Sequence, residues 1–359
     1  MIGVLTLNGR LVDLGNLSLF RPQTAFEHST ISFITKWMSN DKEFSIQTSG
    51  STGKPKNIVL TRKQMEVSAQ ATNSFFGLAK EDTIFLCLNT AYIAGQMMLV
   101  RAMVGQLNVI AIEPNSKPIL PERPSIINFM AFVPLQIKNL LKEGSLDTYR
   151  QLKAIIIGGA SIDNELECVL ETLATPAYAT FGMTETVSHI ALRKLNGKDK
   201  SQYYHALPGI KLGLEDGCLT IEGEVTEFKK IVTTDLVYFK NEHTFKWLGR
   251  KDNVINSGGV KLHIDQIEQR LHPILKRLDI SNRFLCAKKK DALLGEKLVL
   301  VVEGHLDQVN QTHLLSKVID ELPKYWAPKE IIIIENLPQT PTGKPDRKAL
   351  DQRLIKGNL

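Results

Sequence analysis

The sequence predicts an α/β protein divided into two domains, on the strength of three observations. Short apolar runs of strand length alternate with longer segments of helical period in the first part of the chain. After Gly249 this alternation gives way to a glycine-centred hairpin and a second set of helices and strands, so the domain boundary is expected at Arg250 to Asp252. The chain has 359 residues, 43% apolar and 23% charged, which is enough material for a core in each domain.

Apolar periodicity and local stop signals predict the individual elements. Thr61 and Gln64 form a capping-box pattern between a strand at residues 58–60 and a helix that ends at Gly77. We expect further buried strands at residues 83–88, 108–112 and 154–157, with a helix containing Met97, Met98 and Arg101 between the first two. In the second domain we expect a helix near residues 265–271, strands at 298–302 and 331–334, and a helix near 312–321.

The charge balance favours small anionic ligands over nucleic acid. The net charge is +6 and the pI is near 9.0, but the one tight basic run, Lys288 to Lys290, is followed by Asp291 and is expected in a solvated loop. We therefore expect no nucleic-acid partner. Scattered lysines suit anionic substrates.

Cysteine usage and hydropathy predict a cytoplasmic protein. Its four cysteines lie far apart in the sequence and are interpreted as reduced core thiols, with no zinc or thiol-disulfide spacing: Cys87, Cys168, Cys218 and Cys286. The first 14 residues contain Asn8, Arg10 and Asp13, which argues against a secretory leader. The longest apolar region, residues 84–112, is interrupted by polar side chains and is not expected to span a membrane.

A loop rich in glycine and hydroxyl groups gives the first indication of function. It reads Thr48, Ser49, Gly50, Ser51, Thr52, Gly53, Lys54, Pro55 and Lys56. Glycines let backbone N–H groups approach anionic oxygens, hydroxyls add donors and lysines add charge, which suits a polyphosphate. The spacing is not that of a Walker A loop, and such a loop by itself could equally be a flexible surface turn.

Further motifs follow in a fixed order along the chain. They are residues 180–186 (TFGMTET), 233–235 (TTD), 249–252 (GRKD), 257–261 (SGGVK) and 341–347 (PTGKPDR). Together with the loop, they resemble the adenylate-forming superfamily of acyl-CoA synthetases, peptide-synthetase adenylation domains and firefly-type luciferases. The resemblance implies a large domain of mixed sheets flanked by helices at residues 1–250, and a small mobile α+β domain at residues 251–359. It also implies ATP, Mg²⁺ and coenzyme A as ligands.

The resemblance assigns roles to individual residues. The loop at Thr48 to Lys56 would cover the ATP phosphates, and Glu185 would hold Mg²⁺. Other residues would bind the nucleotide: Gly159, Ala160 and Phe181 at the adenine, Gly182 and Thr184 beside the phosphates, and Asp235 and Arg250 at the ribose. This chain departs from the superfamily pattern at Phe181, where tyrosine is usual, and at Thr234, where glycine is usual.

The C-terminal motif is expected to carry the lysine of the adenylation step. By resemblance, Lys344 would reach the reacting carboxylate and the α-phosphate, whereas Arg347 and Lys348 are interpreted as surface charges. Lys251 and Asp252 fall where the superfamily pivots, and Gly258 and Gly259 would line the coenzyme A tunnel. Alternatively, the glycine pair is only a hairpin turn.

The acid to be activated is suggested by a closer resemblance. Residues 92–101 and 183–189 look most like those of o-succinylbenzoate:CoA ligases, whose substrate has a second carboxylate that a cation or hydroxyl must recognise. Candidates are Arg101, Ser188, His189 and, as a weaker one, Arg193. Arg101 could instead snorkel or pair structurally, and His189 could be a structural histidine.

Three functions remain open at this stage. They are an ATP-dependent acid:CoA ligase, an adenylation enzyme that loads a carrier protein, and a non-catalytic nucleotide-binding protein. The superfamily usually carries about a hundred more residues before the phosphate loop. We therefore expect either a compact large domain or a face covered by a second copy in a homodimer.

Overall fold

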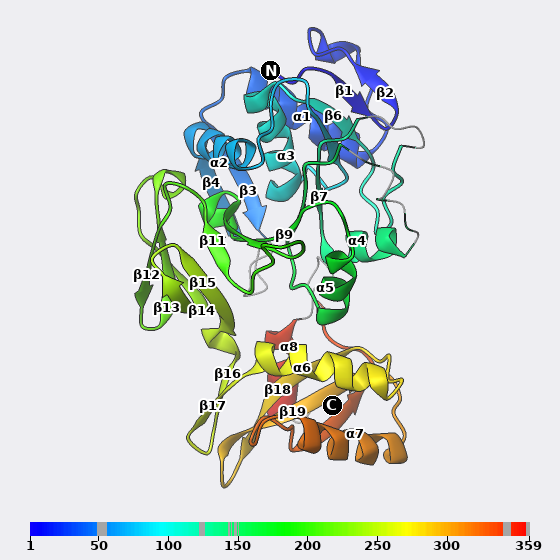
Figure 1. The fold of residues 1–359 in the computed structure, drawn as a ribbon, viewed down its shortest axis with the longest axis vertical. Coiled ribbons are helices and arrows are strands. Elements are labelled where there is room, and N and C mark those ends of the chain that lie inside the picture. Colours follow the sequence, from blue (N-terminus) through cyan, green and yellow to red (C-terminus); the bar gives the residue numbers. More distant parts are fainter. Residues whose placement is uncertain are drawn as a thin grey trace.

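The structure is a computed structural model that describes residues 1–48, 56–121, 126–142, 144, 146, 149, 151–339 and 346–356. Its strands form one large sheet, a separate hairpin and a second sheet near the C-terminus (Figure 1). None of the helices in these ranges combines the length and apolar character that a membrane span requires.

The large sheet is mixed, as predicted. Its order is β12-β13-β14-β15-β11-β10-β9-β8-β7-β5-β6-β1-β2. The pairs linking β9, β8, β7, β5, β6 and β1 are parallel, and the remaining pairs are antiparallel. The bounds are β1 Leu5–Leu7, β2 Arg10–Val12, β5 Thr83–Leu86, β6 Asn108–Ala111, β7 Phe129–Phe132, β8 Ala154–Ile157, β9 Ala177–Gly182, β10 His189–Lys194, β11 Tyr204–Ala206, β12 Lys211–Glu215, β13 Cys218–Glu222, β14 Ile231–Asn241 and β15 Thr244–Arg250.

Helices accompany the large sheet: α1 Ala25–Met38, α2 Arg62–Phe75, α3 Ile93–Gly105, α4 Pro134–Leu141 and α5 Asn164–Glu171. The predicted capping box at the start of α2 is confirmed, because the Gln64 N–H donates to the Thr61 hydroxyl and the Gln64 side chain accepts from the Thr61 N–H. The helix ends near Gly77, which has a φ of +59° that glycine adopts without strain.

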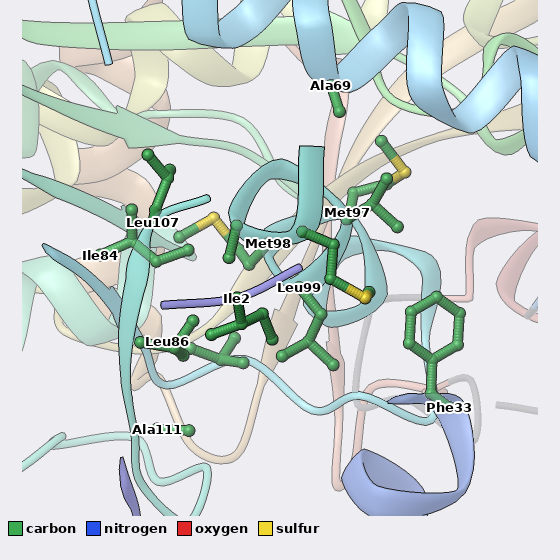
Figure 2. Packing of buried hydrophobic residues seen from close by; sticks show 14 of the residues in the cluster. Ile2, Phe33, Ala69, Ile84, Leu86, Met97, Met98, Leu99, Leu107 and Ala111 are labelled. Atoms are coloured by element: carbon green, nitrogen blue, oxygen red, sulfur yellow. The ribbon is translucent and has the colours of Figure 1, made fainter. Parts of the chain in front are cut away.

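Helix α3 is buried on several sides. Figure 2 shows Met97, Met98 and Leu99 of α3 among side chains from the large sheet, with Phe33 of α1 and Ala69 of α2 in the same cluster. All three α3 side chains have no exposed surface. A polar side chain on this helix is therefore carried into the interior, which matters for Arg101.

The predicted phosphate loop connects two paired strands. β3 Glu43–Thr48 and β4 Lys56–Thr61 form an antiparallel hairpin in which Thr48 pairs with Lys56. Ser49, Gly50, Ser51, Thr52 and Gly53 lie outside the described residues.

The second sheet contains β16 Val254–Ser257, β17 Val260–His263, β18 Phe284–Asp291, β19 Gly295–Glu303 and β20 Glu330–Ile334. One face packs against α6 Ile264–Arg277 and α7 Gln308–Glu321, and the other packs against α8 Arg347–Lys356. The large sheet ends with Arg250 and the second sheet begins at Val254. Division of the chain into domains at this point stays a prediction.

Two local expectations in this region are wrong. The basic run Lys288 to Lys290 lies in strand β18 rather than in a loop, and Lys289 pairs with Glu330 at 2.8 Å. Pairing with β19 along the whole of β18 outweighs the low strand propensity of lysine. Helix α6 extends past Pro273 to Arg277, since the buried Ile274 and Leu275 pack into the core beyond it.

Two interpretations of single side chains also need correction. Cys87, Cys218 and Cys286 are buried free thiols, but Cys168 is exposed on α5. Arg347 is not a free surface charge, because its guanidinium forms a two-pronged ion pair with Glu268 of α6. Neither outcome could be predicted from neighbouring residues in the sequence, because the packing of α5 and α8 against the sheets decides which of their side chains are buried.

Candidate active site

The predicted adenine residues lie at the carboxyl ends of two neighbouring parallel strands. β8 ends at Ile157 and leads to Gly158, Gly159 and Ala160, while β9 ends at Gly182. In open α/β sheets this edge is where ligands bind. A Cβ on Gly158 would stand 2.2 Å from the Thr180 Oγ1, so only glycine allows the two strand ends to approach this closely.

The Phe181 ring belongs to an aromatic group on the same sheet. Its centroid lies 5.6 Å from that of Tyr204 and 5.1 Å from that of Phe245. The side chain is half-buried, so part of its surface stays accessible. Phenylalanine suits this position because, unlike tyrosine, it has no hydroxyl that would need a hydrogen-bond partner among the neighbouring rings.

A tight loop joins Gly182 to His189. The Thr186 hydroxyl accepts from the Met183 N–H at 3.1 Å and lies 3.0 Å from the Ser188 carbonyl. Val187 is fully buried at a φ of +67°, a left-handed value that costs free energy for a β-branched residue. A Cβ on Gly182 would come within 2.2 Å of the Ser188 carbonyl oxygen. The loop is thus held in one strained conformation.

Glu185 lies in the short 3-10 helix Thr184–Thr186 of this loop. Its half-buried carboxylate has neither a hydrogen-bond nor an ion-pair partner among the residues that the structure describes. Strand β4, which begins at the end of the predicted phosphate loop, contacts the same 3-10 helix. A carboxylate without a partner among the described residues fits Mg²⁺, which binds through one or two carboxylates and the substrate phosphates.

Asp235 and Arg250 lie opposite each other on the antiparallel strands β14 and β15. One Asp235 carboxylate oxygen accepts from the Trp247 indole N–H at 2.8 Å. Burial raises the pKa of the Asp235 carboxyl, against the lowering effects of this hydrogen bond and of the Arg250 charge. The two predicted ribose contacts are therefore brought together, and Trp247 holds one of them in place.

Arg101 is a buried cation that has no counter-ion among the residues that the structure describes. Only 2% of the residue is exposed, and burial lowers the pKa of its guanidinium to about 10. One terminal nitrogen donates to the Ser188 hydroxyl at 2.8 Å and the other approaches the Met98 sulfur at 3.5 Å, while Nε has no partner among the described residues. The side chain is buried and does not snorkel to solvent, so that alternative from the sequence is wrong. Its hydrogen bond to Ser188 is consistent with the other alternative, a structural pairing, as well as with a substrate role.

Ser188 and His189 extend this polar cluster. The Ser188 hydroxyl lies 3.5 Å from the His189 Nδ1, and the His189 Nε2 lies 3.2 Å from the Thr72 hydroxyl. Because the Thr72 proton is used on the Ser68 carbonyl at 3.1 Å, the His189 Nε2 carries the donating hydrogen. The loop that holds Glu185 leads directly into this cluster, because Ser188 and His189 follow it in the chain.

His189 makes stability depend on pH. Burial, and then the charge of Arg101, holds the pKa of His189 well below its ordinary value, so the ring stays neutral in the folded chain. The unfolded chain binds a proton as the pH falls below about 6.5, so the folded state loses up to about 1.4 kcal/mol per pH unit there. Urea unfolding at pH 7.5, 6.5 and 5.5 should show a shallower loss in His189→Gln than in the wild type, and equal slopes would contradict this.

The remaining predicted residues are not brought into the cluster. Arg193 forms a two-pronged ion pair with Glu167, at 2.9 and 3.0 Å, and so has a structural partner. Gly258 and Gly259 have positive φ values at the turn of the β16–β17 hairpin, which extends away from the large sheet (Figure 1). The hairpin-turn interpretation of this pair is confirmed. Lys344 lies outside the described residues.

The predicted hinge residues form a short link between the sheets. Lys251 and Asp252 lie in the 3-10 helix Lys251–Asn253, and the Asp252 carboxylate accepts from the Arg250 guanidinium at 3.2 Å. Asp265, at the start of α6, accepts from the Arg250 N–H and from the Asn253 side chain, each at 3.0 Å.

Sequence reasoning missed three residues of this arrangement: Thr72, Trp247 and Asp265. Thr72 stands on the buried face of α2, yet its partner His189 is 117 residues away. Trp247 stands just before the motif at residues 249–252, and Asp265 stands shortly after the motif at residues 257–261, so neither belongs to a motif. Trp247 reaches Asp235 because of the register in which β14 pairs with β15. No signal in the sequence indicates that register.

The comparisons with known proteins agree with this geometry. The family model described as AMP-binding enzyme matches residues 31–217. A 2-succinylbenzoate–CoA ligase of Lactococcus lactis is 25% identical over 356 residues, which cover 89% of this chain and 76% of that protein.

Two solved structures extend the comparison. An acyl-CoA synthetase (AMP-forming)/AMP-acid ligase II-like protein from Dyadobacter fermentans is 39% identical, with a TM-score of 0.62, and the match covers 93% of this chain and 96% of that one. The second is the o-succinylbenzoate CoA synthetase of Bacillus subtilis in complex with an acyl-adenylate intermediate, with a TM-score of 0.70 and 21% identity. The match covers 85% of this chain and 68% of that one and shows that the two share a fold. With a family model that covers more than half of its length and a relative of 39% identity, this chain belongs to the AMP-binding enzyme family.

Proposed function

We propose that this chain is an ATP-dependent acid:CoA ligase whose acid carries a second carboxylate, with o-succinylbenzoate as the substrate. The reaction has two steps. The acid and ATP give an acyl-adenylate and pyrophosphate, and the acyl group then passes to the thiol of coenzyme A with release of AMP.

The observation that carries this proposal is the buried Arg101 guanidinium. A buried charge without a counter-ion is costly unless something compensates it. A substrate carboxylate would supply the missing charge and accept a charge-assisted hydrogen bond from the guanidinium, with the Ser188 hydroxyl as a second donor. The relatives named for 2-succinylbenzoate support this choice of acid, because that molecule has a carboxylate to spare after the other is activated.

The other residues fit the first step. A carboxylate that attacks the α-phosphate brings like charges together, so donors and cations must offset the repulsion. The backbone of the loop at residues 48–56 would bind the phosphates, Asp235 and Arg250 would orient the ribose, and Phe181 with Gly159 and Ala160 would bind the adenine. Lys344 would bring its ammonium to the reacting oxygens. Mg²⁺ held by Glu185 would neutralise phosphate charge when bound.

The second step requires a different arrangement at the same site. Lys344 has to leave before a thiol can enter, so we expect rotation about Lys251 and Asp252, with Gly258 and Gly259 then lining the path of the pantetheine arm. Loading of a carrier protein would use the same residues and differ only in the thiol acceptor.

Acid-dependent ATP–pyrophosphate exchange tests the proposal. The panel should include o-succinylbenzoate, benzoates, fatty acids and amino acids, followed by coenzyme A with the best acid. Exchange with o-succinylbenzoate and formation of its thioester are expected. Exchange with another acid alone would overturn the substrate, a thioester formed only on a carrier protein would overturn the acceptor, and ATP binding without any exchange would favour a non-catalytic nucleotide-binding protein.

A further inference from the structure

Arg347 joins three elements of the second sheet region. It is the first residue of α8, and one of its terminal nitrogens donates both to the Glu268 Oε1 at 2.8 Å and to the Cys286 carbonyl at 3.0 Å. Its other terminal nitrogen donates to the second oxygen of Glu268. The Glu268 Oε1 also accepts from the Cys286 N–H at 2.6 Å. Helix α6, strand β18 and the start of α8 are thereby closed into one ring of hydrogen bonds.

This ion pair differs from most of those in the described part of the chain, because both partners are largely shielded from water. The side-chain exposure is 24% for Arg347 and 14% for Glu268, whereas in the pair between Arg277 of α6 and Glu321 of α7 it is 58% and 39%. Shielded two-pronged pairs fix geometry far better than exposed pairs do, since both hydrogen bonds have to break together.

The pair lies at the base of the segment that carries Lys344. The Asp346 N–H donates to the Pro338 carbonyl at 2.8 Å, so the two ends of that segment meet at one point. On the incoming side, the Leu337 N–H donates to the Glu303 carboxylate at 2.8 Å and the Leu337 side chain is buried. On the outgoing side, Asp346 caps α8 through the Ala349 N–H at 3.0 Å, and Arg347 follows immediately.

We infer that Arg347 is a positioning residue for adenylation, which acts through Glu268 to fix the base of the Lys344 segment and does not itself touch the substrate. The inference rests on the proposed function, because it assigns a purpose to the pair only if Lys344 acts in the first step. A lysine side chain is long and flexible, so the reach of its ammonium depends on where the backbone that bears it is held. A displacement of about 1 Å at that backbone can cost up to about a hundredfold in rate.

The test compares the two half-reactions in Glu268→Gln and Arg347→Lys. Adenylation is measured by acid-dependent pyrophosphate exchange, and thioester formation by adding coenzyme A to preformed acyl-adenylate. We expect exchange to fall roughly tenfold to a hundredfold in both variants, while thioester formation stays within about twofold, because Lys344 has left the site in that step. Glu330→Gln, which removes the partner of Lys289 and Lys297 on the same sheet, is the matched control and should change neither rate.

A double-mutant cycle separates positioning from a merely structural role. In a Lys344→Ala background, adding Glu268→Gln should cause no further loss of exchange, because the ion pair acts only through that lysine. Hydrogen exchange of peptides that cover the Asp346 amide should be faster in Glu268→Gln and unchanged in Glu330→Gln. A loss of both half-reactions together, or additive losses in the cycle, would overturn the inference.

The two proposals fail in different ways. A wild-type chain that shows no pyrophosphate exchange with any acid would overturn the proposed function and the positioning role of Arg347 with it. An active wild type whose exchange is unchanged by Glu268→Gln would leave the ligase in place and overturn the inference alone.

Discussion

Replacing Glu185 by glutamine is expected to lower acid-dependent pyrophosphate exchange by about 10²- to 10³-fold, the loss typical when one group that stabilises transition-state charge is removed. The carboxylate is half-buried and has no partner among the described residues, so glutamine removes the charge without breaking a hydrogen bond or an ion pair with any of them. The variant should therefore unfold at the same urea concentration as the wild type. Exchange should be measured at several Mg²⁺ concentrations, because a weakened metal site is partly rescued by excess metal.

Glu242→Gln is the matched control for this experiment. Glu242 is exposed in the turn between β14 and β15, and the same chemical change there should leave exchange and its Mg²⁺ dependence unaltered. Exchange at the wild-type rate in Glu185→Gln would show that the carboxylate does not hold Mg²⁺ at the ATP phosphates.

Replacing Arg101 by methionine is expected to have opposite effects on activity and on stability. With o-succinylbenzoate as the acid, kcat/KM for exchange should fall by about 10²-fold or more, since truncating one partner of a buried charge pair costs about 2–5 kcal/mol. The free energy of unfolding should stay the same or rise by about 1–3 kcal/mol, because methionine fills much of the space without a buried charge. Steady-state exchange kinetics and urea unfolding of the same preparations measure both quantities.

Arg193→Met separates this effect from the general loss of a buried arginine. Arg193 is paired with Glu167, so its removal leaves that carboxylate only the longer contact with Lys200 at 3.9 Å and should lower stability without changing the KM for the acid. If Arg101→Met instead destabilised the fold and left the KM unchanged, Arg101 would be a structural residue and the proposed acid site would be wrong.

Local sequence signals account for much of the first part of the chain. The Thr61 and Gln64 capping box, the stop at Gly77 and the strand at residues 154–157 all involve groups within a few positions of one another, and the structure has them as expected. The antiparallel half of the large sheet, from β10 to β15, was not predicted. Short turns join β12 to β13 and β14 to β15, but β11 pairs with β15 from a distant part of the sequence, and such a pairing leaves no short-range signal.

Motif order was sufficient to indicate the family, but the motifs do not tell how their members meet. Gly182 and Ser188 are close because β9 and β10 are antiparallel with a tight loop between them. Asp235 faces Arg250 because of the register of β14 and β15. In both cases the residue types came from the sequence, and the spatial pairing came from the sheet.

The sequence by itself determined which chemical groups are present, in the order of one family: a loop rich in glycine and hydroxyl groups, a carboxylate at Glu185, a guanidinium at Arg101 and an ammonium at Lys344. Only the tertiary structure decided what each charge does. Arg101, Arg193 and Arg347 are chemically identical, yet one is buried without a carboxylate partner in the described ranges, one is paired with Glu167 and one is paired with Glu268. The free energy of a charge depends on its burial and its partners, and both are set by residues 26 to 87 positions away.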